Sequence, residues 1–191
     1  MLAPRSDNHE TVSIYRLDEE TREQLLSLAS ECVFNWCTKD EHPMGVIMSC
    51  MWYDGRMWLT ATAQRHRISA VRRNPRVSVV VTSTTTSMGS NKTCTIKGRC
   101  TVHEDEKTKN WFYPAFAAHL QPGAEAAAAA FAQMLDSPLR VVLEVVPEKF
   151  VSYDGSKMFR HAAGTLDESE LAPPLESDSV RLEAERKKRG L

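Results

Sequence analysis

The sequence lacks the features that would place it in a specialised class of protein. Its 191 residues contain no apolar run near the roughly 20 residues that a membrane-spanning helix needs. The first residues, MLAPRSDNHE, lack the apolar stretch of a secretory signal. The formal net charge is −1, so no overall charge draws the chain to nucleic acid or to an anionic membrane. These absences predict a soluble, cytoplasmic protein with neither a nucleic-acid nor a membrane partner.

Cysteine and histidine spacing also excludes several kinds of site. The number of cysteines is odd, none belongs to a C-x-x-C pair, and no histidine falls at zinc-finger spacing. This argues against a disulfide framework and against a metal site. No Ser–His–Asp or paired-carboxylate arrangement stands out, so no catalytic residue is identified. We expect small buried thiols in strands at all five cysteines: Cys32, Cys37, Cys50, Cys94 and Cys100.

The sequence does contain a regular succession of β-rich runs separated by turn residues. Asp54-Gly55 lies between two such runs, which is a strong signal for a β-hairpin. Gly98 interrupts a long alternating run and predicts a bulge, whereas the β-branched residues of 76–82 suggest burial on both faces. A second Asp-Gly pair within 150–159 predicts another turn. Strands are predicted over residues 32–38, 44–52, 57–63, 76–82, 92–102 and 139–146.

Helical patterns occur between these strands and near both ends. Asp18 is a good N-cap for a first helix, a short basic helix follows at 65–73, and a helical pair is inserted late, at 107–136. Strands joined by tight turns indicate an antiparallel barrel rather than a parallel doubly wound sheet. Because apolar residues become scarce from Gly164 onward, we predict a folded domain over 1–163 and a polar, charged tail over 164–191, either an exposed helix or disordered.

One segment, residues 57–81, carries a chemical signal. A strand with Thr60 and Thr62 on one face runs directly into a helix whose start holds Arg65 and Arg67. Free N–H groups, the positive end of the helix dipole and two guanidinium groups together suit a phosphate ester. The alternative is a solvated basic face, since charge runs usually mark exposure. Arginines at a helix N-terminus are unfavourable unless an anion is bound there, which favours a site.

In the order of these elements the sequence resembles the pyridoxamine 5′-phosphate oxidase-like superfamily, the FMN-binding split β-barrels. The resemblance covers roughly residues 25–158 and rests on the Asp54-Gly55 hairpin, the strand MWLTATA, the R-x-R helix start, the helix end RRNP and the strand RVSVVV. Gly98 fits a glycine that recurs in the family. The resemblance implies a mainly β fold with peripheral helices, in which residues 1–163 form an FMN-binding split-barrel domain. It also implies a homodimer with the cofactor at the subunit interface.

The resemblance also implies which residues contact the cofactor. In this family the helix start binds the phosphate, the preceding strand adds hydroxyl and backbone contacts, and the strand before that passes along the flavin ring. The run MGVIMSCMW lacks the Arg-then-Lys pattern of the oxidase proper, so vitamin B6 oxidation is not expected. The implied cofactor-binding residues are Arg65, His66, Arg67, Thr60, Ala61, Thr62, Met48, Ser49 and Cys50.

The implied activity is that of an FMN-dependent oxidoreductase acting on a small, aromatic or conjugated substrate. The helix start and RRNP are closest to the flavin/deazaflavin oxidoreductase branch, so a deazaflavin-coenzyme-dependent reductase and a non-enzymatic flavin- or haem-binding protein are the alternatives. FMN is expected first because two arginines and nearby hydroxyls suffice for one phosphate. A deazaflavin coenzyme would need a further basic groove, for which Arg72, Arg73 and Lys97 are candidates. The helical pair at 107–136 is expected to form much of the wall beside the ligand.

Overall fold

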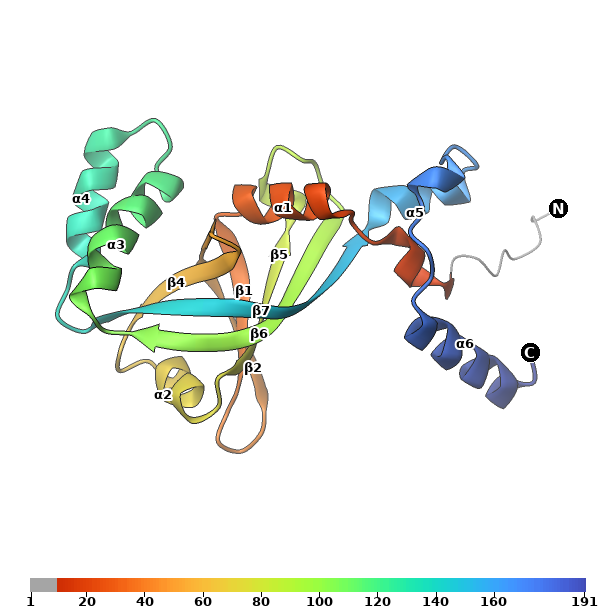
Figure 1. Cartoon of the computed structure of the whole chain (residues 1–191), viewed down its shortest axis with the longest axis horizontal. Coiled ribbons are helices and arrows are strands. Elements are labelled where there is room, and N and C mark those ends of the chain that lie inside the picture. Colours follow the sequence, from red (N-terminus) through yellow and green to blue (C-terminus); the bar gives the residue numbers. More distant parts are fainter. Residues whose placement is uncertain (1–9) are drawn as a thin grey trace.

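Seven antiparallel strands form one curled sheet in the computed structural model, which describes residues 10–191 (Figure 1). Residues 1–9, which hold most of the stretch without a secretory pattern, lie outside the described residues. The sheet order is β2-β1-β5-β6-β7-β4-β3. The strands are β1 Glu31–Cys37, β2 Pro43–Ser49, β3 Met51–Tyr53, β4 Arg56–Thr62, β5 Arg76–Thr82, β6 Lys92–His103 and β7 Arg140–Asp154.

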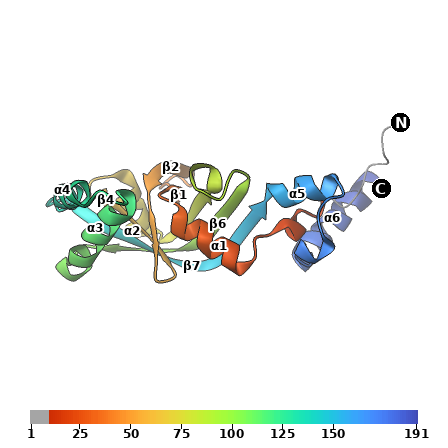
Figure 2. The same ribbon diagram turned by 90° about the horizontal axis from the view of Figure 1, so that it is seen from above.

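The helices lie at the rims and ends of this sheet. In Figure 1, α1 and α2 lie at opposite rims, whereas α3 and α4 lie at the opposite end of the molecule from α5 and α6, as Figure 2 also shows. None of the helices in residues 10–191 is long and apolar enough to cross a bilayer. The helices are α1 Glu19–Leu28, α2 His66–Arg73, α3 Glu106–Leu120, α4 Glu125–Leu135, α5 Gly155–Ala162 and α6 Glu176–Arg189, with 3-10 turns at η2 Val12–Tyr15, η3 Ser83–Thr85 and η4 Glu168–Glu170.

The curled sheet confirms the predicted fold class, which is mainly β with peripheral helices in a split antiparallel barrel. Strands β2 and β4, near opposite edges of the sheet, contact each other, so the sheet closes into a half-barrel. The inner face packs against Leu25 and Leu26 of α1 and against Ile68 and Val71 of α2. The homodimer stays a prediction, because the structure contains one chain.

A second apolar cluster lies on the outside of the sheet under α3. It packs Phe112 and Phe116 of α3 against Trp58 of β4 and Val142 of β7, with Leu135 of α4 beside them. The start of α3 is fixed by the side chain of its N-cap, Asp105, which accepts a hydrogen bond from the backbone N–H of Thr108. The helical pair is therefore anchored over the part of β7 that begins at Arg140.

The two Asp-Gly pairs have different structures. Asp54 and Gly55 have φ of 52° and 69° and close the β3–β4 hairpin, as predicted. At the second pair the prediction of a turn is wrong, because Asp154 instead caps α5, accepting a hydrogen bond from the N–H of Ser156 at 2.9 Å. Strand β7 consequently runs on for 15 residues where the sequence predicted a shorter strand and a turn.

Residues 44–52 form two strands rather than the single predicted one. β2 pairs with β1, whereas β3 pairs with β4 at the far edge of the sheet, so the chain must change partners between them. Cys50 makes that change, and its N–H donates to the carbonyl of Ser30 instead of to a neighbouring strand. An apolar run alone does not indicate which edge each half joins.

Gly98 lies at a break in strand register, as predicted. The β6–β7 pairing shifts between Lys97 and Gly98, and a Cβ at Gly98 would overlap the carbonyl oxygen of Val146. Burial on both faces of β5 is wrong, because its side chains alternate: Val77, Val79 and Val81 are buried, and the residues between them are partly exposed.

The cysteines agree only in part with the prediction of buried thiols in strands, because Cys50 lies between β2 and β3. All five thiols are free and four are buried, with Cys37 half-buried. Residues 176–189 form the exposed helix α6. The backbone N–H of Ser13 donates to Asp178 of this helix at 3.2 Å, so α6 packs beside the first described turn. The division into 1–163 and 164–191 stays a prediction.

Candidate functional site

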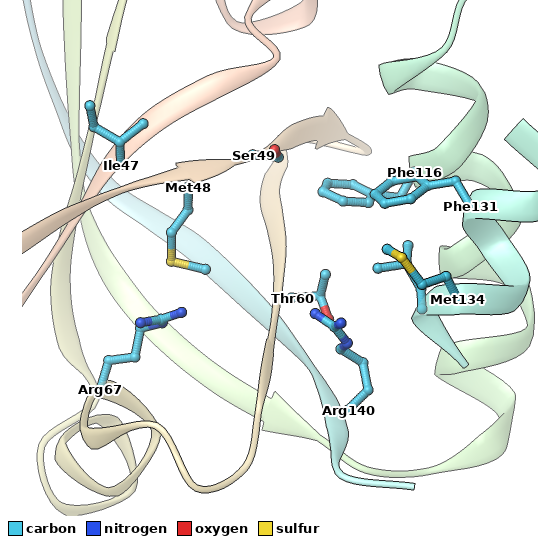
Figure 3. Close-up of a pocket in the computed structure, with 10 residues that line it drawn as sticks. Ile47, Met48, Ser49, Thr60, Arg67, Phe116, Phe131, Met134 and Arg140 are labelled. Carbon is cyan, nitrogen blue, oxygen red and sulfur yellow. The ribbon is translucent and has the colours of Figure 1, made fainter. Parts of the chain in front are cut away.

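A cleft of about 260 Å³ opens between β2, β4, the start of α2 and the helical pair α3–α4 (Figure 3). One wall comes from the sheet and α2, and the facing wall comes from α3, α4 and the beginning of β7. The residues that line it are Ile47, Met48, Ser49, Thr60, Arg67, Phe116, Phe131, Met134, Leu135 and Arg140. The lining is apolar apart from two hydroxyls and two guanidinium groups.

The two arginines have no partner in the described part of the chain. The Nε atoms of Arg67 and Arg140 are buried, and within residues 10–191 neither has a hydrogen-bond partner. Figure 3 shows both side chains projecting into the cleft from different elements, Arg67 from α2 and Arg140 from the start of β7. Buried polar groups are nearly always hydrogen-bonded, and two guanidinium groups with unpartnered Nε atoms in one cleft could hold an anion.

The electrostatics of Arg67 agree with this interpretation. Burial lowers the pKa of the Arg67 guanidinium, and the neighbouring charge of Arg65 lowers it further. Both effects disfavour the positive charge in the absence of a counter-ion. A bound anion would reverse them, because it stabilises the charged form.

The start of α2 adds backbone donors close to Arg67. Arg65 is the N-cap residue, and its side chain makes no capping hydrogen bond. The N–H groups of the first turn are therefore not capped by this side chain. The Arg65 N–H itself donates to Thr62 at 3.0 Å, which fixes the turn from β4 into the helix. Arg67 thus lies on a rigid strand–turn–helix connection.

Four of the nine predicted cofactor-binding residues line the cleft together: Met48, Ser49, Thr60 and Arg67. Met48 is buried and Ser49 is exposed. The Thr60 hydroxyl donates to the carbonyl of Val141 at 2.8 Å, so it is already used to join β4 to β7 and retains only its acceptor capacity.

The other five predicted residues lie elsewhere, for reasons of geometry. Ala61 follows Thr60 on the strand and therefore faces the core, where it is buried. Cys50 is also buried, with its Sγ 3.7 Å from the carbonyl oxygen of Ala29. Thr62 is half-buried outside the cleft lining, and Arg65 and His66 are exposed at the helix start.

The three basic residues named as candidates for a deazaflavin groove lie outside this cleft, and such a groove stays a prediction. Arg72 pairs with Glu104, and Arg73 donates to the carbonyl of Cys37 at 3.1 Å. Lys97 lies on an exposed position of β6. None of the three lines the cleft.

Sequence reasoning missed Arg140 and placed the helical wall only in outline. Of the helical pair, Phe116, Phe131, Met134 and Leu135 line the cleft. Arg140 follows a turn after α4 and begins a strand, where a basic residue has no pattern that marks a site.

Comparison with known proteins gives a consistent result. The family model for pyridoxamine 5′-phosphate oxidase matches residues 17–153. No curated protein matches the sequence. A conserved hypothetical protein from Mycobacterium tuberculosis is 18% identical with a TM-score of 0.65, over 77% of this chain and 91% of that one.

Two further similar solved structures are of proteins that are named after a cofactor. One named F420 reductase is 20% identical with a TM-score of 0.52, over 68% of this chain and 94% of that one. An FAD-binding protein from Mesorhizobium loti is 20% identical with a TM-score of 0.53, over 71% of this chain and 94% of that one. At these identities the likeness shows the shared fold.

Proposed function

Because the chain belongs to the pyridoxamine 5′-phosphate oxidase family, we propose that it is an oxidoreductase that binds FMN in the cleft between β2, β4, α2 and α4. The observation that carries this proposal is the buried, unpartnered Nε of Arg67 at the start of α2. A phosphate monoester carries the charge and the acceptor oxygens that this guanidinium and the first-turn N–H groups require.

The rest of the cleft fits a flat, largely apolar ring system. Met48 and Phe116 give apolar surface on facing walls, and Ser49 and Thr60 contribute oxygen atoms at the sheet side. Burial of aromatic and thioether groups against a planar ligand is favourable. FMN, when bound, would supply hydride or electron transfer to a small aromatic or conjugated substrate.

The chain's own contribution is to bind, orient and exclude water. Among the described residues that line the cleft there is no Asp, Glu, His, Lys, Tyr or Cys. A proton required by the reaction therefore comes from the substrate or from solvent rather than from a titratable side chain of this wall. Arg67 and Arg140 instead supply positive charge that favours anionic forms of the ligand.

A second copy of the chain is proposed to complete the site. Ile47 lines the cleft and is 73% exposed, and Met44 on the same edge strand, β2, is 45% exposed. An apolar edge strand is normally paired or covered. We expect a homodimer that covers this edge, which size-exclusion chromatography with light scattering would detect.

The test of the proposal compares FMN with riboflavin, which lacks only the phosphate. The purified protein should retain FMN through gel filtration, seen as the visible absorbance of oxidised flavin. Arg67→Ala should weaken FMN binding about 10- to 100-fold and leave riboflavin binding unchanged, because one charge-assisted contact contributes about 1.5–3 kcal/mol. Arg73→Ala, on the same helix but outside the cleft, is the matched control.

Two results would contradict the proposal. A protein that ignores FMN would move the assignment to the deazaflavin coenzyme or haem, which are titrated next. A protein that binds FMN but never oxidises reduced nicotinamide or reduced flavin with any acceptor would be a cofactor-binding protein rather than an enzyme.

A further inference from the structure

The cleft holds a second guanidinium, which comes from a different element than Arg67. Arg140 is the first residue of β7, and its backbone is fixed on both sides. Its N–H donates to Ser137 at 2.9 Å, and the neighbouring Leu139 carbonyl accepts from Ala63 at 2.7 Å. The side chain is thus held at the mouth of the cleft by a rigid strand start rather than by a loop (Figure 3).

Nothing in the described chain neutralises this charge. The Arg140 Nε is buried and without a hydrogen-bond partner among residues 10–191. The hydroxyl of Tyr113, close enough for the Arg140 charge to act on it, is also buried and unpartnered in that part of the chain. Burial raises the pKa of Tyr113 to about 12, so the phenol stays protonated and is a hydrogen-bond donor. Both groups are donors that lack an acceptor.

Arg67 and Arg140 also come from different walls. Arg67 extends from α2 on the sheet side, whereas Arg140 begins β7 and in Figure 3 lies next to Thr60, on the side of the cleft toward Met134 of α4. Burial and the charge of Arg65 disfavour the positive charge of Arg67, and the Nε of Arg140 is buried without a hydrogen-bond partner in residues 10–191. Each of the two guanidinium groups would be stabilised by an anion of its own in the complex.

We propose that Arg140 is a second anion-binding residue, independent of Arg67, and that the filled cleft holds two anionic groups at once. This rests on the proposed function only in taking the first group to be the cofactor phosphate. The second group is a carboxylate or phosphate joined to an apolar, planar body, because α4 lines this wall with Phe131, Met134 and Leu135. It belongs either to the substrate or to an extension of the cofactor.

The first experiment distinguishes these two sources by cofactor titration. Dissociation constants for riboflavin, FMN and FAD are measured on the wild type, Arg140→Ala and the control Arg99→Ala, whose side chain is exposed on β6 outside the cleft. If the second anion belongs to the cofactor, Arg140→Ala weakens FAD about 10- to 100-fold more than it weakens FMN. If it belongs to the substrate, Arg140→Ala leaves all three constants within about twofold of the wild type.

The second experiment tests the substrate source directly. Benzoate and benzamide are titrated into the flavin-loaded protein, and binding is read from the change in the flavin spectrum. Arg140→Ala should weaken benzoate about tenfold or more without changing benzamide, and Arg140→Lys should restore part of the loss. Equal binding of benzoate by the wild type and Arg140→Ala, together with unchanged FAD binding, would overturn the proposal.

A third measurement keeps the two proposals separate. If the wild type binds no flavin, the proposed function fails, and inorganic pyrophosphate then replaces it as the probe. Pyrophosphate should raise the melting temperature of the wild type and of Arg99→Ala, with a smaller rise for Arg67→Ala and for Arg140→Ala. A full response in Arg140→Ala would overturn the second anion site, whatever the cofactor is.

Discussion

Two groups of charged residues, each with a member on β7, differ in whether the rest of the chain supplies their partners. The cleft arginines, Arg67 and Arg140, have no partner within residues 10–191. The partnered cluster, Arg56, His103 and Glu144, is complete in itself. Glu144 is only 6% exposed, accepts from Arg56 and lies 2.7 Å from Nε2 of His103. Arg140 and Glu144 are four residues apart on β7.

This difference separates a structural role from a binding role. The buried carboxylate of Glu144 has two basic partners, so its hydrogen-bonding capacity is used within the protein. These contacts also join β4, β6 and β7. A buried guanidinium without a match weakens the free protein and is useful only when a ligand is present. The comparison therefore predicts that substitutions in the two groups have opposite effects on stability and binding.

The largest expected effect is on the partnered cluster. Glu144→Ala leaves Arg56 and His103 without their carboxylate, and the loss of these charge-assisted hydrogen bonds should lower the free energy of unfolding by about 1.5–3 kcal/mol in urea denaturation. FMN affinity of the folded variant should be unchanged. Glu148→Ala, which removes an exposed pair to Arg99, should cost less than about 0.5 kcal/mol. If Glu144→Ala lowered the free energy of unfolding as little as Glu148→Ala does, the proposed difference between the partnered cluster and the cleft arginines would be contradicted.

The next effect has the opposite sign. Arg67→Met removes a half-buried charge that has no partner in the described chain, so the ligand-free protein should be as stable as the wild type or up to about 1 kcal/mol more stable. The increase in melting temperature caused by FMN should be lost, as thermal unfolding with and without FMN would show. A marked loss of stability in the free variant would mean that Arg67 has a structural partner.

A smaller effect is expected for a charge that is partnered but exposed. Asp18 caps α1, and the N–H of Thr21 holds the pKa of its carboxyl below the usual 3.8. A lowered pKa stabilises the fold above the unfolded value, and this contribution is lost as the pH falls through the folded pKa. Asp18→Ala should therefore cost about 1 kcal/mol at neutral pH and little at about pH 2.

The control for this cap is Asp18→Asn, which keeps the hydrogen-bond acceptor and removes the titration. Its melting temperature should stay near that of the wild type at neutral pH. The difference in stability between Asp18→Asn and Asp18→Ala should vary less with pH than the difference between the wild type and Asp18→Ala. A cap contribution that persists unchanged in acid would show that the charge of Asp18 is not involved.

The smallest effect is expected at Arg65. This residue is exposed at the cap of α2 and does not line the cleft. Arg65→Ala should change the FMN dissociation constant by less than about twofold, measured beside Arg67→Ala. A tenfold loss of FMN affinity would place the phosphate at the helix cap rather than beside Arg67. The R-x-R motif would then locate the phosphate site better than the cleft lining does.

Local patterns predicted the elements well and the site only in part. The Asp54-Gly55 hairpin, the Asp18 cap and the Gly98 bulge are each set by a few neighbouring residues, so the sequence contains the information directly. The start of α2 is local in the same sense, and it located Arg67. Ala61 and Cys50 were implied by the family resemblance alone. In the structure the side chain of Ala61 faces the core and Cys50 is buried between β2 and β3, and their contact with a cofactor stays a prediction.

Arg140 could not be predicted because its role arises only from tertiary structure. It becomes a cleft residue when the α3–α4 pair folds back over the sheet and β7 starts beside β4, where Arg140 pairs with Thr62. The same holds for Asp154, whose Asp-Gly sequence suits a hairpin turn. In the folded chain this residue ends β7 and caps α5.

The wall formed by α4 has a kinetic consequence. Four of its five consecutive alanines, residues 126–130, are exposed, and the helix packs mainly against α3, so intrinsic helix propensity holds much of it in place. Short helices of this kind open locally at low free-energy cost, well below that of unfolding the sheet. Amide hydrogens of α4 should exchange much faster than those of β7. Fluctuations of α4 would then set how long a ligand resides, while the arginines set how tightly it binds.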